Sequence, residues 1–238
     1  MLLECKNLCV GYTESEYVFK NINVQLDCGQ TLAVTGINGA GKTTFINAIM
    51  GLLDTGCYIS GKIHACGIEI TQGDGDEMRN FRRSMVSLMP QDVAGSLNPL
   101  TKIGQQIRSA AVISGKYKKP DNFICCEILA KMGFENPAEI FKMYPHELSL
   151  GMAARCLLAM SLITKPSILI LDEPTASLDR TLKNEIIDII TDYSLESGCG
   201  IIVVTHDESD LLNFNKLTVL NMGDKNDKNR RAVQKLRQ

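Results

Sequence analysis

Residues 36–43 read Gly36-Ile-Asn-Gly-Ala-Gly-Lys-Thr43 and fit the pattern G-x-x-x-x-G-K-[ST]. In this pattern the glycines allow successive backbone N–H groups to surround phosphate oxygens. A short apolar run at residues 31–35 predicts a buried strand before the stretch, and a helix is expected at residues 44–50 after it. Strand, glycine-rich loop and helix in this order predict a phosphate-binding loop. The alternative, a glycine-rich turn that matches by accident, is disfavoured by these flanking elements.

The residues of this loop have distinct expected roles. Lys42 is expected to reach the β- and γ-phosphates, the Thr43 hydroxyl to ligate Mg²⁺, and Thr44 to donate to the α-phosphate. The start of the following helix adds a partial positive charge. The cradle itself is expected to consist of Gly36, Asn38, Gly39, Ala40 and Gly41. The loop therefore predicts binding of ATP with Mg²⁺, and it leaves open what the nucleotide is used for.

Two further apolar runs also end in polar residues. Residues 167–171 lead into Asp172 and Glu173, and residues 200–205 lead into His206. Because ligands bind beyond the carboxyl ends of strands in open α/β sheets, the runs are expected to deliver these side chains to one edge. Asp172 suits Mg²⁺ held through water, and Glu173 suits a base that polarises an attacking water. An acidic pair that only caps a helix is the alternative.

Length and composition favour one large α/β domain or two small ones, since the chain has 238 residues, of which 45% are hydrophobic. We expect a single domain over residues 1–223. A helical pattern from about residue 95 to 163, with one helix over 121–131, predicts a helical subdomain inserted into the α/β body. Residues 224–238 are mostly Lys, Arg, Asn and Asp, which indicates an exposed helix or a frayed polar tail.

Charge and hydropathy exclude several classes of function. The balance of 25 basic and 27 acidic residues gives no general attraction to nucleic acid, so no nucleic-acid partner is expected. No apolar run approaches the ~18–20 residues that cross a bilayer, and the first residues lack the features of a signal peptide. We therefore expect a cytosolic protein that another chain holds at any membrane. The nine cysteines contain no C-x-x-C pair and are expected to be mostly buried, small hydrophobes.

Several motifs together resemble those of ABC ATPases. Residues 168–179, Ile-Leu-Ile-Leu-Asp-Glu-Pro-Thr-Ala-Ser-Leu-Asp, resemble the Walker B and D-loop segment, and residues 148–152, Leu-Ser-Leu-Gly-Met, resemble the signature. Gln91 resembles the Q-loop glutamine, residues 204–207 resemble the H-switch, and Tyr12 lies where the family has an adenine-stacking aromatic. The resemblance runs from residue 2 to about 223 in family order and spacing. It implies a P-loop NTPase of ABC type, with a mostly parallel core sheet, an antiparallel N-terminal β subdomain and the inserted helical subdomain.

The resemblance also implies roles for these residues in ATP hydrolysis. Gln91 would sense Mg²⁺ and the γ-phosphate, and His206 would contact the γ-phosphate and help Glu173 and Lys42 in catalysis. Ser149 and Gly151 would bind the γ-phosphate of an ATP held by the opposite subunit, and Asp179 would cross the dimer interface. A single histidine after a strand is more often a satisfied surface or core residue, and a single tyrosine more often serves packing. Because the motifs occur together in the order of the family, the functional roles are favoured over these alternatives.

Two stretches resemble the peptide and nickel importer branch of the family: Ser-Leu-Asn-Pro at 96–99 and Tyr-Pro-His-Glu-Leu-Ser at 144–149. This resemblance implies transport coupled to ATP hydrolysis, with transmembrane permease subunits and an extracytoplasmic substrate-binding protein as partners. It also implies a peripheral location on the cytoplasmic face of the cell membrane. The cargo stays open between peptide, nickel and a metal chelate. A regulatory nucleotide-binding subunit and a soluble ABC ATPase are the alternatives.

The signature departs from the family pattern at two points. Its usual Gly-Gly is Leu150-Gly151, and Ala153-Ala154 stand where polar or basic residues are usual. A leucine hinders the close approach and the backbone freedom that glycine permits. We therefore expect a weakened signature, and a second ATPase subunit that is a different chain.

Overall fold

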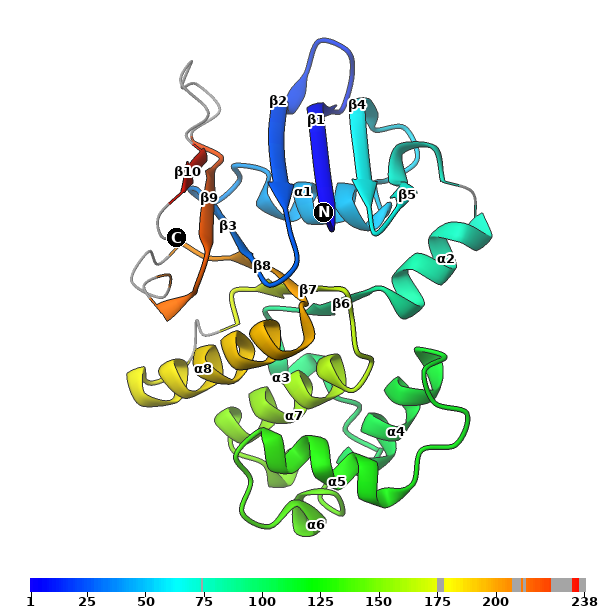
Figure 1. The fold of residues 1–238 in the computed structure, drawn as a ribbon, viewed down its shortest axis with the longest axis vertical. Coiled ribbons are helices and arrows are strands. Elements are labelled where there is room, and N and C mark those ends of the chain that lie inside the picture. The colour runs from blue at the N-terminus through cyan, green and yellow to red at the C-terminus, as the bar shows by residue number, and fades with distance from the viewer. Residues whose placement is uncertain (74, 175–177, 207–210, 212, 224–232, 236–238) are drawn as a thin grey trace.

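The computed structural model describes residues 1–238 apart from 74, 175–177, 207–210, 212, 224–232 and 236–238. Its N-terminal sheet is antiparallel, with strand order β2-β1-β4-β5 (Figure 1). The strands are β1 (Leu3–Gly11), β2 (Tyr17–Leu26), β4 (Tyr58–Ala65) and β5 (Ile68–Glu69). Along β2, Ile22, Val24 and Leu26 are buried while the residues between them are exposed. This alternation places one face of the sheet on the core. The antiparallel pairing of its strands confirms the expected antiparallel N-terminal sheet.

The second sheet has strand order β10-β9-β3-β8-β7-β6. Its strands are β3 (Thr31–Thr35), β6 (Val86–Met89), β7 (Ile168–Asp172), β8 (Gly200–Val204), β9 (Leu217–Asn221) and β10 (Val233–Lys235). All neighbours pair in parallel except β9 and β10, which are antiparallel. The central strands β3 and β8 are buried along their whole length, as strands covered on both faces should be. The mostly parallel core sheet is thus confirmed.

Helices cover the sheets and fill the segment between β6 and β7. The helices outside this segment are α1 (Lys42–Met50), α2 (Gly75–Ser84) and α8 (Arg180–Ser197), with the 3₁₀ turn η1 (Ile70–Gln72). Those between β6 and β7 are α3 (Val93–Ser96), α4 (Ile103–Ile113), α5 (Asn122–Lys131), α6 (Pro137–Ile140), η2 (Pro145–Glu147) and α7 (Leu150–Leu162). Helix α5 begins after Asp121, whose Oδ1 accepts from Ile124 N at 2.9 Å. The segment is therefore helical as expected, while its status as a subdomain and the boundary at residue 223 stay predictions.

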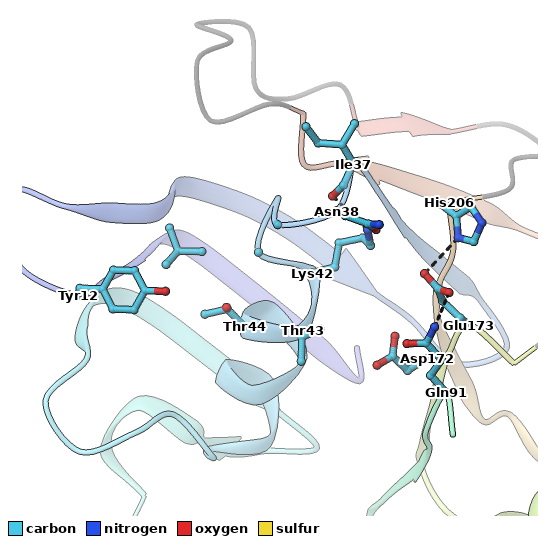
Figure 2. A pocket seen from close by; sticks show the side chains of 13 residues that line it. Tyr12, Ile37, Asn38, Lys42, Thr43, Thr44, Gln91, Asp172, Glu173 and His206 are labelled. Atoms are coloured by element: carbon cyan, nitrogen blue, oxygen red, sulfur yellow. Dashed lines mark hydrogen bonds and ion pairs between the residues drawn. The ribbon is translucent and has the colours of Figure 1, made fainter. Parts of the chain in front are cut away.

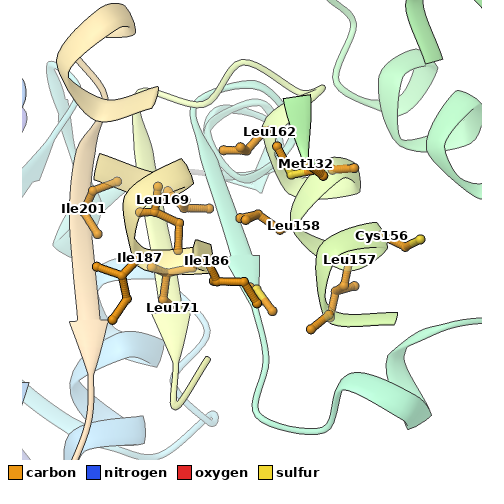
Figure 3. Close-up of a cluster of buried hydrophobic side chains, with 14 of the residues drawn as sticks. Met132, Cys156, Leu157, Leu158, Leu162, Leu169, Leu171, Ile186, Ile187 and Ile201 are labelled. Atoms are coloured by element: carbon orange, nitrogen blue, oxygen red, sulfur yellow. The ribbon is translucent and has the colours of Figure 1, made fainter. Parts of the chain in front are cut away.

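Two clusters of buried side chains lie on opposite faces of the parallel sheet. One joins Leu169, Leu171 and Ile201 of the sheet to α7 and α8 (Figure 3). The other joins Ile170 and Val204 to α1 and to the N-terminal sheet. Packing on both faces fixes the parallel strands between two layers (Figure 1). The carboxyl ends of β3, β7 and β8 therefore form a rigid edge.

The structure corrects two expectations. Residues 233–235, expected within a helix or a frayed tail, form β10 and pair with β9, while 224–232 and 236–238 lie outside the described residues. Among the cysteines, only Cys5, Cys125, Cys156 and Cys199 are buried, and Cys28 is exposed. The four remaining thiols, those of Cys9, Cys57, Cys66 and Cys126, are partly buried. Among the described residues, no helix combines the length and the apolar character that a membrane crossing requires.

Candidate functional site

A cavity of about 780 Å³ opens at the carboxyl ends of the parallel strands (Figure 2). Its lining includes residues of the glycine-rich loop after β3, of the start of α1, and of the carboxyl ends of β6, β7 and β8 or the positions just after them. This is the edge at which α/β sheets bind ligands. The cavity is lined by Tyr12, Val18, Ile37, Asn38, Gly39, Gly41, Lys42, Thr43, Thr44, Gln91, Asp172, Glu173 and His206.

The predicted phosphate-binding loop at residues 36–43, called the phosphate-type loop below, is folded around the side chain of Lys42. Lys42 Nζ donates to Gly36 O at 2.7 Å and to Ile37 O at 3.2 Å, so the ammonium group is held by its own loop. Gly41 has a φ of 97°, and a Cβ there would lie 2.6 Å from Val18 Cγ1. Glycine is therefore required at this position both by conformation and by space. The N-cap residue of α1 is Gly41, which has no side chain to accept from the first N–H groups of the helix, so these groups suit a ligand.

Two residues of the predicted cradle support the loop and do not line the cavity. The Ala40 side chain is buried in the core cluster that includes α1. A Cβ on Gly36 would lie 3.2 Å from Ala40 Cβ, so these two residues lie against each other behind the loop. Their role in binding remains a proposal.

The carboxylate of Glu173 has a partner at each oxygen. Gln91 Nε2 donates to Glu173 Oε2 at 3.0 Å, and His206 Nδ1 lies 3.1 Å from Glu173 Oε1 (Figure 2). Glu173 has a φ of 49°, in the left-handed region, and its backbone N–H donates to Val204 O at 2.9 Å. A non-glycine residue in that region stores strain that the surroundings must hold, which is common at functional positions. The structure thus brings together the three residues expected at the ends of β6, β7 and β8.

Asp172 ends β7 beside this group. Burial raises the pKa of its carboxyl, the charge of Glu173 raises it further, and the ammonium of Lys42 lowers it. Asp172 and Thr43 both line the cavity (Figure 2). Carboxylate and hydroxyl oxygens are the donors that Mg²⁺ prefers. A divalent cation would add positive charge beside the partly buried carboxylate of Asp172, so the residues present fit the expected ion.

Three aromatic or apolar side chains also line the cavity. Tyr12 is 62% exposed and lies opposite Glu173, with its ring at the rim (Figure 2). Val18 and Ile37 also line the cavity, although they were not predicted to do so. Ile37 occupies a variable position of the loop motif, and Val18 comes from β2 without any local signal. Val18 reaches the cavity because β2 packs against the loop at Gly41.

Ser149, Gly151 and Asp179 lie apart from this cavity and line a second hollow of about 450 Å³. Ser149 Oγ accepts from Met152 N at 3.3 Å and caps α7, and Asp179 Oδ1 accepts from Leu182 N at 3.0 Å and caps α8. The structure therefore brings these three together with one another, and not with the phosphate-type loop. Residues 175–177 and 207, which belong to the D-loop and H-switch patterns, lie outside the described residues.

The departures in the signature have different surroundings. Leu150 is 44% exposed at the first turn of α7, whereas Ala153 and Ala154 are buried in the core cluster beneath that helix. Small apolar side chains suit those two buried positions, and polar ones there would lack partners. Of these three residues only Leu150 is exposed, and it stands in the chain between Ser149 and Gly151, which line the second hollow.

Comparisons with known proteins agree with this architecture. Over residues 19–176 the chain matches the family described as ABC transporter. It is 34% identical over 213 residues to the oligopeptide transport ATP-binding protein OppD of Lactococcus lactis subsp. lactis, which covers 87% of this chain and 62% of that protein. It is 32% identical over 212 residues to the dipeptide transport ATP-binding protein DppD of Bacillus subtilis, covering 87% and 63%. The chain thus spans less than two thirds of the length of these relatives.

Solved structures share the fold. The dimeric structure of MJ0796, a bacterial ABC transporter cassette, superposes with a TM-score of 0.78 at 23% identity, over 97% of this chain and 100% of that one. The structure of cbiO1 from Clostridium perfringens, part of the ABC transporter complex cbiONQ, gives 0.78 at 28% identity, over 92% and 84%. Together with the matched family and the curated relatives, these likenesses lead to one conclusion. The chain belongs to the ABC transporter family and is related to oligopeptide and dipeptide transport ATP-binding proteins.

Proposed function

We propose that this chain is the ATP-binding and ATP-hydrolysing subunit of an ABC transporter that imports peptides, nickel or metal chelates. The observation that carries the proposal is the single cavity in which the phosphate-type loop faces Asp172, Glu173, Gln91 and His206. A loop for phosphates, an oxygen pair for a cation and a hydrogen-bonded carboxylate are the parts that phosphoryl transfer to water requires.

The residues divide the chemistry as follows. Lys42 leaves the carbonyls of its own loop and donates to the β- and γ-phosphates, so one buried ammonium exchanges neutral acceptors for charged ones. Thr43 and Asp172 would hold Mg²⁺, with Gln91 nearby, and the ion would neutralise negative charge on the phosphate oxygens. Glu173 accepts a hydrogen bond from the attacking water and orients it toward the γ-phosphorus, and His206 donates to the γ-phosphate. The water oxygen bonds to the γ-phosphorus while the bond from this phosphorus to the β–γ bridging oxygen breaks, which yields ADP and inorganic phosphate.

Tyr12 stacks on the adenine ring from the rim of the cavity. Its exposure supports this role, because a ring that is 62% exposed contributes little to the core and is free to cover a ligand. Asn38, Gly39, Gly41 and Thr44 line the same cavity and contribute backbone or hydroxyl donors to the phosphates.

The second hollow serves an ATP that another ATPase subunit holds. In this arrangement Ser149 and Gly151 contact the γ-phosphate of the partner's nucleotide, and Asp179 crosses the interface. The exposed Leu150 at the first turn of α7 interferes with that contact, which favours a partner that is a different chain. A strong site then forms from this chain's loop and the partner's signature, and a weak one from this chain's signature. The same leucine favours a weakly hydrolysing, regulatory subunit as the second candidate function.

Transport requires further partners. The likeness to oligopeptide and dipeptide transport proteins supports the proposal that this chain works with transmembrane permease subunits and, indirectly, with an extracytoplasmic substrate-binding protein. The chain would then lie at the cytoplasmic face of the membrane as a peripheral subunit. Closure of two ATPase subunits on ATP, and reopening after product release, moves the helices between β6 and β7 against the permease.

The test is to purify the tagged full chain from membranes and to measure ATP hydrolysis and peptide or nickel uptake by the reconstituted complex. The proposal expects permease subunits and a second ATPase chain in the preparation, with uptake that requires ATP. Replacement Leu150→Gly should raise the ATPase rate if the leucine weakens the second site. Purification of an active ATPase without any permease would overturn the transport role.

A further inference from the structure

Two side-chain contacts, about one helical turn apart, join the starts of α7 and α8. At the first contact, a Cβ added to Gly151 would lie only 2.3 Å from Leu182 Cδ2, so the leucine packs directly on the glycine. At the second, Arg155 Nη2 forms an ion pair with Glu185 Oε2. Residues 151 and 155, and residues 182 and 185, are neighbours on one face of their helices. The two contacts therefore form a continuous seam between the helices.

Arg155 is fixed in this seam and is not a solvated surface residue. Its side chain is 19% exposed, against 49% for Glu185. Its Nη1 also lies 3.5 Å from the carbonyl oxygen of Gly133, at the end of α5. Its Nε is buried and has no hydrogen-bond partner among the described residues. Arg155 therefore connects α7 with α8 through Glu185, and with the end of α5 through Gly133. Removal of Glu185 would leave the largely buried charge of Arg155 without a compensating charge.

The seam lies directly below the two helix caps. Ser149 caps α7 and Asp179 caps α8, and both line the second hollow together with the four seam residues Gly151, Arg155, Leu182 and Glu185. Helix α7 belongs to the helices between β6 and β7, whereas α8 follows β7 of the parallel sheet. The seam thus crosses from one group of helices to the other, and it sets the spacing between Ser149 and Asp179.

We propose that Leu182, Arg155 and Glu185 are positioning residues that hold Ser149, Gly151 and Asp179 as one surface for the partner subunit's ATP. This inference rests on the proposed function, in which the second hollow closes on that nucleotide. None of the three residues needs to touch the nucleotide. Leu182 fills the space beside position 151, and the Arg155–Glu185 pair prevents α7 from sliding along α8.

The experiment uses the reconstituted complex with variants Leu182→Ala, Arg155→Gln and Glu185→Gln, and the charge exchange Arg155→Glu with Glu185→Arg. The variants are made in the Leu150→Gly background, in which the proposed function expects the second site to contribute to turnover. We expect each single variant to lower that contribution to the ATPase rate at least about tenfold, because a misplacement of ~1 Å in a site can cost ~10²-fold. Binding of a fluorescent ATP analogue to the purified chain's own loop should be unchanged, since the loop lies in the other cavity. The charge exchange should recover most of the lost rate. Leu195→Ala, an exposed position of α8, is the matched control.

The variant Ser149→Ala distinguishes a failure of the positioning role from a failure of the function proposed for the second hollow. If Ser149→Ala slows turnover while Leu182→Ala and Glu185→Gln behave like Leu195→Ala, the seam has no positioning role and the proposed function stands. If Ser149→Ala also leaves turnover unchanged, the second hollow does not serve the partner's ATP, and both are overturned. Glu185→Gln keeps the test decisive if Leu182→Ala fails to fold, because Glu185 is half exposed and its replacement is isosteric.

Discussion

Nδ1 of His206 lies 3.1 Å from Oε1 of Glu173, and the other oxygen of that carboxylate accepts from Gln91 at 3.0 Å. The three side chains follow three neighbouring strands, β8, β7 and β6, so one parallel edge positions them all. Both oxygens of the proposed base are thus engaged by protein groups. An attacking water must take over one of these hydrogen bonds, and we expect Gln91 to release it as it turns toward the cation.

Replacement Gln91→Ala is expected to separate binding from hydrolysis. It removes the donor that holds Glu173 Oε2, so the carboxylate loses part of its orientation while the phosphate loop stays intact. ATP affinity should change little, and the ATPase rate of the reconstituted complex should fall about tenfold or more. Gln105→Ala, at an exposed position of α4, is the control. Equal losses in both variants would contradict a specific role for Gln91.

Replacement Lys42→Ala should abolish tight nucleotide binding. Hydrogen bonds to charged groups contribute about 1.5–3 kcal/mol each, which corresponds to a ~10–100-fold rise in Kd per bond lost. Isothermal titration with a non-hydrolysable ATP analogue measures this change. Lys62→Ala, which removes an exposed lysine from β4, should leave the Kd unaltered. An unchanged Kd for Lys42→Ala would show that the loop does not hold the phosphates.

The ionisation of Asp172 should make the stability of the metal-free chain depend on pH. Burial, and then the charge of Glu173, raise the pKa of this carboxyl in the folded state. The folded state therefore binds more protons than the unfolded state, and stability falls as the pH rises from the ordinary carboxyl value through the raised pKa. Asp172→Asn removes this penalty, so its Tm in a metal chelator should exceed that of the parent chain near pH 8 and match it close to pH 4.

Addition of Mg²⁺ with a non-hydrolysable ATP analogue provides the counterpart of this measurement. The parent chain should gain more in Tm than Asp172→Asn, because only the parent offers a carboxylate to the cation. A Tm advantage of Asp172→Asn that persists at pH 4 would contradict the electrostatic explanation.

Gly104 in α4 tests the packing of the helices between β6 and β7. A Cβ at this position would lie 2.2 Å from the ring of Phe141, so Gly104→Ala forces the ring to move. Such overpacking costs about 1–3 kcal/mol, and each kcal/mol lowers the Tm of a chain of this size by about 2–4 °C. In Gly75→Ala, at the start of α2, the added methyl meets no atom within 4 Å among the described residues outside its own helix backbone, and the Tm should be unchanged or higher. Equal Tm values for the two variants would contradict this packing.

The sequence predicts most of the first cavity because its signals are local. The loop motif, the apolar runs and the polar residues at their ends each lie within a few positions, and parallel pairing of β3, β8 and β7 brings them together. The strand beginning at Thr31 and the helix after Asp121 also follow from local patterns. For such elements, side-chain periodicity and capping residues are sufficient.

The remaining features depend on contacts between distant segments. Val18 lines the cavity only because β2 lies against the loop at Gly41. Leu182 packs on Gly151 across two helices, and nothing in the sequence around either residue indicates this contact. Strand β10 lies in a polar segment, where its pairing with β9 overrides a composition that is poor in strand formers.

Replacement Glu173→Gln, measured in the reconstituted complex, tests the central claim most directly. The substitution keeps the size of the side chain and removes the charge that orients water, so ATP hydrolysis should fall by ~10²–10⁴-fold while binding of ATP with Mg²⁺ is retained. Trapping of ATP in a stable complex of the two ATPase subunits should accompany the loss. Turnover that persists at the parental rate in this variant would contradict the assignment of Glu173 and, with it, the proposed mechanism.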